Sequence, residues 1–341
     1  MSENKQMAWV IDLNKCIGCQ TCSVACKMLW TREESEKVQW WCSVNTLPGK
    51  GTPKDWEQMG GGYDASGNLQ EGHIPTDKEF GGGFNFNHKE VFYGGGKGEQ
   101  YLEPQGDRED RWAMNWDEDE GAGDWPNSYY FYMPRICNHC TKPACADACP
   151  SGALTKGSDG LVLRDESVCK GAKKCMAACP YKKIYFNEER NVGQQCIGCF
   201  PRIEKGVAPA CVRQCPGRAM FVGWLNEKDT PVNRLVKEWE VALPLHPEYG
   251  TKPNVYYVPP MAPPPLNEDK SVNPDGTRIP PEYLESLFGP DVHGALEKLK
   301  SERQVVKDGG KSELMKTLIA YNWNELLGPF TADPGKIIAT D

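Results

Sequence analysis

Apolar residues in this chain come in short runs, and each run predicts a brief strand or helix rather than a long one. Residues 7–13 (Met-Ala-Trp-Val-Ile-Asp-Leu) predict a strand, and residues 21–31 predict a helical turn after it. Residues 151–168 predict a hairpin, because apolar residues flank a Gly/Asp turn at 157–160. Further short strands are predicted at 129–133, 183–187 and 217–225.

The C-terminal third has a different pattern. Residues 232–241 have a helical face, whereas residues 243–265 are dense in proline and predict an extended arm with little internal hydrogen bonding. Such an arm buries little of itself, so we expect it to wrap the core or a partner. Short amphipathic helices are predicted at 281–289, 291–303 and 312–327.

Residues 46–126 are rich in Gly, Trp, Tyr, Asn and Asp and show no repeat. Because a structureless loop of this length is uncommon in a compact domain, we expect hairpins and ordered loops there, used to dock a partner. The acidic run Asp117-Glu118-Asp119-Glu120 is interpreted as a solvated loop, with a docking surface as the alternative.

Composition indicates a small hydrophobic core. Of the 341 residues 39% are apolar, and 35 glycines and 27 prolines favour irregular structure. Bound inorganic clusters would then supply the missing cohesion. The net charge of −8 disfavours a nucleic-acid partner. No stretch has the roughly 18 apolar residues of a membrane span, and the start lacks the apolar run of a signal peptide.

Cysteine is the most informative residue type, with 16 copies, most of them between residues 137 and 215. A disulfide scaffold is disfavoured, because such scaffolds are usually short secreted chains, whereas ligand thiolates must be reduced when metal is inserted. All but one of the cysteines fall into four runs: Cys16, Cys19, Cys22 and Cys26; Cys137, Cys140, Cys145 and Cys149; Cys169, Cys175 and Cys179; and Cys196, Cys199, Cys211 and Cys215.

Structural zinc also binds Cys-x-x-Cys pairs, but two such pairs complete a zinc site. Here three or four cysteines share each run, and Cys149, Cys179 and Cys215 are each followed by proline. This is the pattern of bacterial ferredoxins, in which three cysteines of a run bind one cluster and the fourth binds the other. The pattern therefore predicts iron–sulfur clusters.

The same crossing rule predicts which cysteines share a cluster. The second and third runs are separated only by the 151–168 hairpin, so they form one two-cluster unit, and the first and fourth runs form the other. The predicted ligand sets are Cys16, Cys19, Cys22 and Cys215 for a first [4Fe–4S] cluster; Cys26, Cys196, Cys199 and Cys211 for a second; Cys137, Cys140, Cys145 and Cys179 for a third; and Cys149, Cys169 and Cys175 for a fourth cluster.

The fourth set lacks one thiolate. In a complete run its middle ligand would stand at position 172, which is Ala172 and cannot bind iron. We therefore expect a [3Fe–4S] cluster there, with an open-cornered [4Fe–4S] cluster as the alternative. Three thiolates leave less negative charge near the iron than four, which should raise the reduction potential.

The remaining candidate residues add little chemistry. Cys42 is left over and is interpreted as a buried free thiol, with a ligand or regulatory role as the alternative. Gly18, Gly171 and Gly198 are expected to let backbone amides approach cluster sulfurs, and His139 to be structural or to hydrogen-bond a cluster. No nucleophile–base pair, phosphate loop or dinucleotide fingerprint is visible. The chain is therefore predicted to carry electrons and not to be an enzyme.

Four stretches are informative beyond their cysteines: residues 12–22 (Asp-Leu-Asn-Lys-Cys-Ile-Gly-Cys-Gln-Thr-Cys), Asn138-His139-Cys140, residues 196–202 (Cys-Ile-Gly-Cys-Phe-Pro-Arg) and residues 242–250 (Ala-Leu-Pro-Leu-His-Pro-Glu-Tyr-Gly). They resemble those of a known family, the iron–sulfur (beta) subunits of type II molybdenum enzymes of the DMSO reductase superfamily. That branch includes nitrate, selenate, chlorate and perchlorate reductases, dimethylsulfide dehydrogenase and ethylbenzene dehydrogenase. Ala172 and the chain length are more similar to perchlorate reductase or ethylbenzene dehydrogenase subunits than to nitrate reductase subunits, which have Trp at that position.

The resemblance implies three [4Fe–4S] clusters and one [3Fe–4S] cluster, a molybdopterin-containing catalytic (alpha) subunit beside the first cluster, and a haem b (gamma) subunit beside the fourth. It also implies a periplasmic location reached by export together with the catalytic subunit; the alternative is cytoplasmic. A beta subunit of formate dehydrogenase or hydrogenase type is an alternative within the same class. Alternatives from other classes are an enzyme whose open-cornered cluster binds substrate, and a structural or sensing iron–sulfur module.

The predicted fold class is α+β, with two bacterial-ferredoxin-like two-cluster units, long loop-rich insertions and an extended C-terminal arm. The predicted parts are residues 1–45 and 190–228 for the first unit, 46–126 for a Gly/Trp-rich docking insertion, 127–189 for the second unit, and 229–341 for the arm with its short helices.

Overall fold

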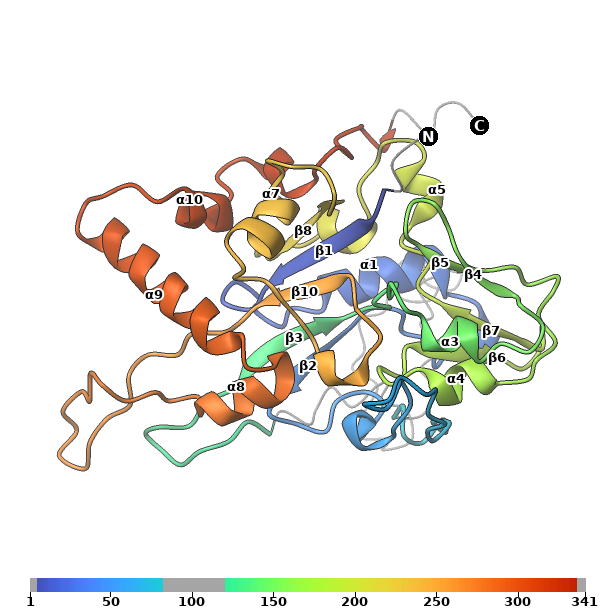
Figure 1. Cartoon of the computed structure of the whole chain (residues 1–341), viewed down its shortest axis with the longest axis horizontal. Coiled ribbons are helices and arrows are strands. Elements are labelled where there is room, and N and C mark those ends of the chain that lie inside the picture. Colours follow the sequence, from blue (N-terminus) through green and yellow to red (C-terminus); the bar gives the residue numbers. More distant parts are fainter. Residues whose placement is uncertain (1–4, 82–119, 336–341) are drawn as a thin grey trace, which may run out of the picture.

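Strand β1 (Met7–Asp12) lies in the middle of the largest sheet of the computed structural model, which describes residues 5–81 and 120–335 (Figure 1). It pairs antiparallel with β8 (Met220–Trp224) and parallel with β10 (Val255–Val258). Strand β9 (Leu243–Pro244) pairs antiparallel with the far side of β10. All six residues of β1 are buried, as expected for a strand covered on both faces.

Short elements make up the rest of the described chain. Three two-stranded antiparallel sheets pair β2 (Ser43–Leu47) with β3 (Phe131–Arg135), β4 (Leu154–Lys156) with β5 (Val162–Arg164), and β6 (Ile184–Asn187) with β7 (Val192–Gln195). The α-helices are α1 (Thr21–Trp30), α3 (Ala144–Asp147), α4 (Lys174–Ala178), α5 (Phe200–Ile203), α6 (Ala210–Arg213), α7 (Pro231–Asn233), α8 (Pro281–Phe288), α9 (Val292–Lys307) and α10 (Glu313–Ile319). Single turns of other helix types are η1 (Glu34–Glu36), η2 (Trp56–Gln58), η4 (Arg234–Glu238), η5 (Pro247–Tyr249) and η6 (Trp323–Leu326).

These elements confirm most of the short segments predicted from the apolar pattern. The strands β1, β3, β6 and β8, the β4–β5 hairpin and the helices α1, α8 and α9 all lie where a strand, hairpin or helix is expected, within a few residues at their ends. Helix α10 begins as predicted but ends at Ile319, well before the predicted end at residue 327, and the single turn η6 follows it. Four strands are not predicted as strands: β2 and β7, and also β9 and β10, which lie in the segment predicted as an extended arm. Of the 46–126 insertion, residues 82–119 lie outside the described residues, and so does most of the acidic run 117–120.

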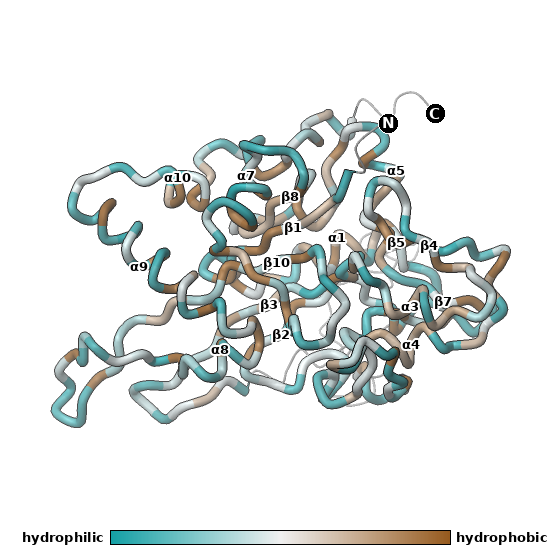
Figure 2. Tube along the Cα trace, viewed as in Figure 1, coloured by the Kyte–Doolittle hydropathy of each residue, from teal (hydrophilic) through white to brown (hydrophobic). Residues whose placement is uncertain are grey.

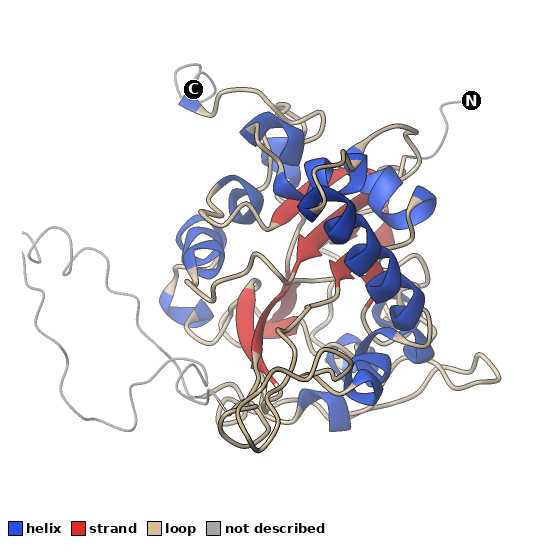
Figure 3. Ribbon diagram, turned by 90° about the vertical axis from the view of Figure 1, so that its left-hand side faces the viewer, coloured by secondary structure: helices blue, strands red, loops and turns tan. Residues whose placement is uncertain are grey.

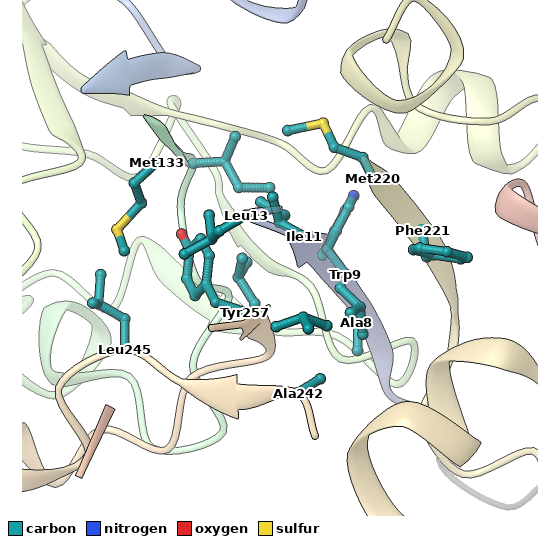
Figure 4. Close-up of a cluster of buried hydrophobic side chains, with 14 of the residues drawn as sticks. Ala8, Trp9, Ile11, Leu13, Met133, Met220, Phe221, Ala242, Leu245 and Tyr257 are labelled. Atoms are coloured by element: carbon teal, nitrogen blue, oxygen red, sulfur yellow. The ribbon is translucent and has the colours of Figure 1, made fainter. Parts of the chain in front are cut away.

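A large hydrophobic core surrounds the main sheet, contrary to the expectation from composition. Trp9, Phe221 and Tyr257, which come from three adjacent strands, are each at most 1% exposed, and Figure 4 shows them among the packed apolar side chains. The tube in Figure 2 is brown along much of these strands. The prediction of a small core fails here because apolar runs far apart in sequence meet in one sheet. A separate, much smaller core lies beside α4, formed by Leu154, Val162, Cys175, Met176 and Ile184.

Residues 243–265 are extended, as predicted, but they are not an arm with few hydrogen bonds. Strand β10 pairs with both β1 and β9, with Trp9 opposite Val255. Prolines at 253 and 259 flank this strand without interrupting it, so each of its residues keeps the N–H that pairing requires. The proline-rich segment therefore completes the core sheet.

The elements on either side of the main sheet differ. Helices α8–α10 lie at one side, and α3, α4 and β4–β7 lie at the opposite side (Figure 1). Turned by 90°, the molecule shows its strands in the interior with helices around them (Figure 3). In the described part of the chain, no helix has both the length and the apolar character needed to cross a membrane.

Candidate metal centres

The first site, defined by the thiols of Cys16, Cys19, Cys22 and Cys215, joins two distant segments. The first three lie after β1 and at the start of α1, Cys215 precedes β8, and all four line one cavity. Burial raises the pKa of Cys16 to about 12, with the Cys22 and Cys215 thiolates adding to the rise. The N–H of Ala219 donates to Cys215 Sγ at 3.4 Å.

The second site lies deeper in the protein. Its four thiols are 6–8% exposed and line one cavity: Cys26, Cys196, Cys199 and Cys211. The indole N–H of Trp30 donates to Cys199 Sγ at 3.3 Å. Cys42 lines the same cavity and is 1% exposed, so its predicted burial is confirmed, while its interpretation as a free thiol that is not a ligand stays a prediction. It also hydrogen-bonds to Cys22, which lowers the pKa of Cys22, so Cys42 lies between the first and second sites.

The third site is a group of four neighbouring thiols from two runs: Cys137, Cys140, Cys145 and Cys179. Burial raises the pKa of Cys137 to about 12, and the Cys179 thiolate adds to that rise. Burial and the neighbouring thiolates also raise the pKa of Cys140 and of Cys145. Such a group becomes four thiolates only when a positive charge, such as iron, is bound among them.

The fourth site has three thiols, Cys149, Cys169 and Cys175, which line one cavity. Ala172 lines the same cavity and is exposed to solvent. The guanidinium of Arg164 donates to Cys169 Sγ at 3.7 Å and to Cys175 Sγ at 3.4 Å. This site therefore combines three thiols, a cation and one open side.

The structure brings the cysteines together in the groups that the crossing rule predicts. The last cysteine of each run lies with thiols of the paired run, as Cys26 does with the fourth run and Cys215 with the first. All sixteen cysteines are described, and all are free thiols. That these thiols bind iron stays a prediction.

The first cysteine of each run is held by the same backbone turn. In every run the residue two positions later has a positive φ, and its N–H donates to the sulfur of that cysteine. These residues are Gly18, His139, Gly171 and Gly198, with φ of 68°, 41°, 68° and 62°. The amide approach expected of the three glycines is therefore present, and His139 has the same role, which the sequence did not reveal because it is not a glycine.

A cation lies beside every site: Lys15 beside Cys215, Lys183 beside Cys26 and Cys196, Lys156 beside Cys137 and Cys140, and Arg164 at the fourth site. Within the described residues none of them forms a close ion pair with Asp or Glu. The charges of Asp12 and Asp159 act on Lys15 and Lys156, whereas no carboxylate acts in this way on Lys183 or Arg164. Lys183 is 1% exposed, and burial lowers its pKa to about 7. A buried cation without a counter-ion is costly. Anionic clusters bound by the neighbouring thiolates would supply the missing negative charge.

Two buried hydrogen-bond donors without partners also indicate that an acceptor, such as a cluster sulfur, belongs beside them. Trp9 lines the second site, and its ring stacks on His139 with 5.6 Å between centroids. Trp9 Nε1 and His139 Nε2 are buried and have no hydrogen-bond partner among the described residues. Burial, with the Lys156 charge, lowers the pKa of His139 to about 3, so the ring is neutral. Its Nδ1 accepts from the Val162 N–H, which leaves Nε2 as an unused donor suited to a cluster sulfur.

The donor geometry fits a polynuclear cluster better than a single ion. In the described ranges, no group of three or more His, Cys, Asp or Glu side chains is placed to hold one metal ion. Zinc needs its thiolates about 2.3 Å from one centre. The thiols of the first, second and fourth sites instead line a cavity between them, as the ligands of a cubane do.

The fold and these thiol groups define an iron–sulfur electron-transfer protein, and comparison with known proteins agrees. Residues 128–225 match the family model of the 4Fe-4S dicluster domain. The chain is 51% identical over 328 residues to the selenate reductase subunit beta of Thauera selenatis, covering 95% of this chain and 99% of that protein. It is 48% identical to the dimethylsulfide dehydrogenase subunit beta of Rhodovulum sulfidophilum, covering 94% and 98%. It is 50% identical to the respiratory nitrate reductase subunit beta of Haloferax mediterranei, covering 93% and 91%.

The chain therefore belongs to the family of iron–sulfur beta subunits of molybdenum-containing reductases and dehydrogenases. It is an electron-transfer component of an oxidoreductase complex, not its catalytic subunit, and the resemblance seen in its motifs is confirmed. Identity to subunits of enzymes named for different substrates is nearly equal. These values alone do not decide whether the chain is nearer to perchlorate reductase or to nitrate reductase subunits, so that prediction from Ala172 and chain length stays a prediction.

Proposed function

We propose that this chain relays electrons through three [4Fe–4S] clusters and one [3Fe–4S] cluster, arranged as two ferredoxin-like two-cluster units. Cys16, Cys19, Cys22 and Cys215 would hold the first, and the second to fourth sites would hold the others. The observation that carries the proposal is that four separate thiol groups, each beside a cation, are assembled by pairing cysteines of different runs. Bound clusters supply one-electron chemistry, while the chain positions them and tunes their potentials.

Low-temperature EPR of the native, oxidised complex tests the cluster types. We expect one [3Fe–4S] signal, and three further [4Fe–4S] signals on stepwise reduction, with about 15 iron atoms per chain by metal analysis, the sum of three cubanes and one three-iron cluster. Intact protein with four [4Fe–4S] signals and no three-iron signal would contradict the assignment of the fourth site.

We propose that the chain works between a molybdopterin-containing catalytic subunit at the first site and a haem b subunit or other redox partner at the fourth. A groove of about 980 Å³ runs beside the first site, lined by Cys16, by Tyr129–Tyr132 and by apolar residues of α9 and α10. Tyr130 and Ile319 line this groove and expose 61% and 43% of their surface, and Ile17, which lines the first site itself, exposes 64%. Such an exposed apolar patch supports a docking surface for a large partner.

Purification of the native complex tests this docking surface. We expect Ile17→Glu and Ile319→Glu to reduce recovery of the catalytic subunit with this chain at least tenfold. Val272→Glu is the control, because Val272 is 59% exposed on a loop away from the groove. Equal recovery of the catalytic subunit with all three variants would show that it docks elsewhere.

We also propose a periplasmic location, reached by export together with the catalytic subunit; the support is family resemblance alone. Fractionation of cells into periplasm, cytoplasm and membrane, followed by detection of this chain, tests it. Assay of the native complex against oxyanions and hydrocarbons identifies the reaction, which belongs to the catalytic subunit.

A further inference from the structure

Arg164 is the cation that touches the sulfurs of the fourth site directly. It stands at the end of β5, and its two terminal nitrogens point to different thiols, Nη1 to Cys169 and Nη2 to Cys175. It forms no ion pair with a carboxylate in the described part of the chain. Its only other hydrogen-bond acceptor there is Gln195 Oε1, at 3.5 Å from Nη2.

The surroundings of Arg164 leave room for the guanidinium and hold it in place. Gly193, on the neighbouring strand β7, lies directly under it: a Cβ on Gly193 would be 2.9 Å from Nη2 and 3.0 Å from Cζ. Gln195 is 2% exposed and is itself fixed by donating to the Val162 carbonyl at 3.1 Å. Arg164 Nε is buried without a hydrogen-bond partner among the described residues. The arginine is therefore built into the site and is not a surface side chain that happens to reach it.

A fixed cation at this position acts on the redox state of the site. Arginine stays protonated at every accessible pH, and its planar fork suits two acceptors at once. Hydrogen bonds to ligand sulfurs withdraw electron density from iron, and reduction adds one electron to a cluster whose negative charge the guanidinium stabilises. Both effects favour the reduced form.

We propose that Arg164 is a positioning residue that clamps two ligand thiolates of the fourth cluster and raises its reduction potential. This inference rests on the proposed function, since it requires a cluster at the fourth site. The reduction potential of the fourth cluster would then be raised by two causes. One is the missing fourth thiolate at Ala172, where the site is open to solvent, and the other is the charge of Arg164.

EPR-monitored redox titration of the native complex tests the proposal with four variants. Arg164→Gln removes the charge and should make reduction of the fourth cluster at least tenfold less favourable, a fall of about 59 mV for a one-electron couple. Arg164→Lys keeps the positive charge but cannot donate to two sulfurs at once, so its midpoint potential should lie between those of wild type and Arg164→Gln. Gly193→Ala displaces the guanidinium without changing any charge and should lower the midpoint in the same direction. Arg190→Gln is the control, because Arg190 is an exposed partner of Glu166 and touches no cysteine.

The midpoint potentials of these variants distinguish a direct effect of Arg164 on the fourth cluster from a general effect on the protein. A fall confined to the fourth cluster in Arg164→Gln and Gly193→Ala, with Arg190→Gln unchanged, supports the proposal. A cluster that remains present with an unchanged midpoint in Arg164→Gln overturns it. If Arg164→Gln fails to retain the fourth cluster, the test rests on Gly193→Ala and Arg164→Lys. Midpoint potentials equal to wild type in both of these variants would overturn the proposal. A wild-type complex with a fourth [4Fe–4S] signal would contradict only the proposed cluster type, and the same titration would then be followed on that signal.

Discussion

Gly198 illustrates how single residues serve the fold and a cluster site together. Its φ is +62°, its N–H donates to Cys196 Sγ at 3.4 Å, and a Cβ there would lie 2.6 Å from Leu161, which is fully buried. Only glycine satisfies all three conditions, because any side chain would be strained and would collide with a residue that has no free space.

Gly198→Ala should therefore lower stability and empty the second site. The left-handed backbone alone costs roughly 1–2 kcal/mol for a residue with a Cβ, and the collision with Leu161 adds to it. Gly152→Ala is the matched control, because Gly152 has nearly the same φ, +65°, but nothing within 4 Å of the added Cβ. We expect Gly198→Ala to show the larger fall in Tm and to lose iron, while Gly152→Ala keeps its iron. Equal iron content in the two variants would contradict a role of Gly198 in the site.

Among single residues, the sequence predicts the cysteines that group together better than it predicts the residues that contact them. The grouping of Cys26 with Cys196 follows from run spacing and the crossing rule, because those are properties of the chain order. Arg164 carries no such signal. It stands five residues before Cys169 on a separate strand, and only the pairing of that strand and the absence of a side chain at Gly193 bring its guanidinium to the sulfurs.

At the scale of elements, a buried histidine ties the proline-rich segment to the start of the 46–126 insertion. His246 is 6% exposed; its Nδ1 lies 2.7 Å from Glu248 and its Nε2 lies 2.9 Å from Glu57 on η2. Its ring also stacks on Tyr249 with 4.7 Å between centroids. Burial by itself lowers the pKa of His246, but the hydrogen bonds and charges of Glu248 and Glu57 outweigh it, so the pKa is raised.

Stability should therefore depend on pH through His246. Because the folded-state pKa is above that of an unfolded histidine, about 6.5, the folded protein holds the proton more tightly. This contribution is fully present below pH 6.5 and is lost as pH rises through the raised folded-state pKa. His246→Asn should lower Tm at pH 6 and much less at pH 9, measured by thermal unfolding.

His293→Asn is the control for this pH effect. His293 also contacts a carboxylate, Glu285 at 2.8 Å, but the pair is about half exposed and screened by solvent. We expect little change in Tm at either pH. A fall in Tm of the same size at pH 6 and pH 9 for His246→Asn would show that packing, not charge, holds this contact.

Helices and strands that have their own apolar pattern can be predicted from the sequence. Strands that form only by pairing with a distant segment cannot. Val255–Val258 stands among prolines, which indicate an arm, yet its partner β1 lies more than 240 residues earlier and draws it into the central sheet. Likewise Ser43–Leu47 becomes a strand only because Phe131–Arg135 pairs with it across the whole insertion. Pairing over such separations leaves no local pattern to read.

At the scale of the whole molecule, cohesion comes from two different sources. The main sheet has its own hydrocarbon core, including Trp9, Phe221 and Tyr257. The opposite side, with α3, α4 and β4–β7, has the small core beside α4, and much of what fills it is cysteine from the third and fourth sites. Cysteines of the first and second sites, such as Cys26 and Cys211, also belong to the main core, but many other apolar side chains surround them there. We therefore expect the side with α3, α4 and β4–β7 to depend more on its clusters than the main sheet does.

Removing iron should therefore loosen the molecule unevenly. Without clusters, Lys156 and Arg164 would remain beside thiols that are no longer tied together, and β4–β7 would have few apolar contacts to hold them. We expect hydrogen exchange, measured by mass spectrometry before and after chelation under reducing, anaerobic conditions, to rise more than tenfold across residues 140–195. Strands β1, β8 and β10 should keep most of their protection, because apolar burial holds them. Protection lost to the same extent in both regions would show that the sheet also depends on the clusters and that the chain folds as one iron-dependent unit.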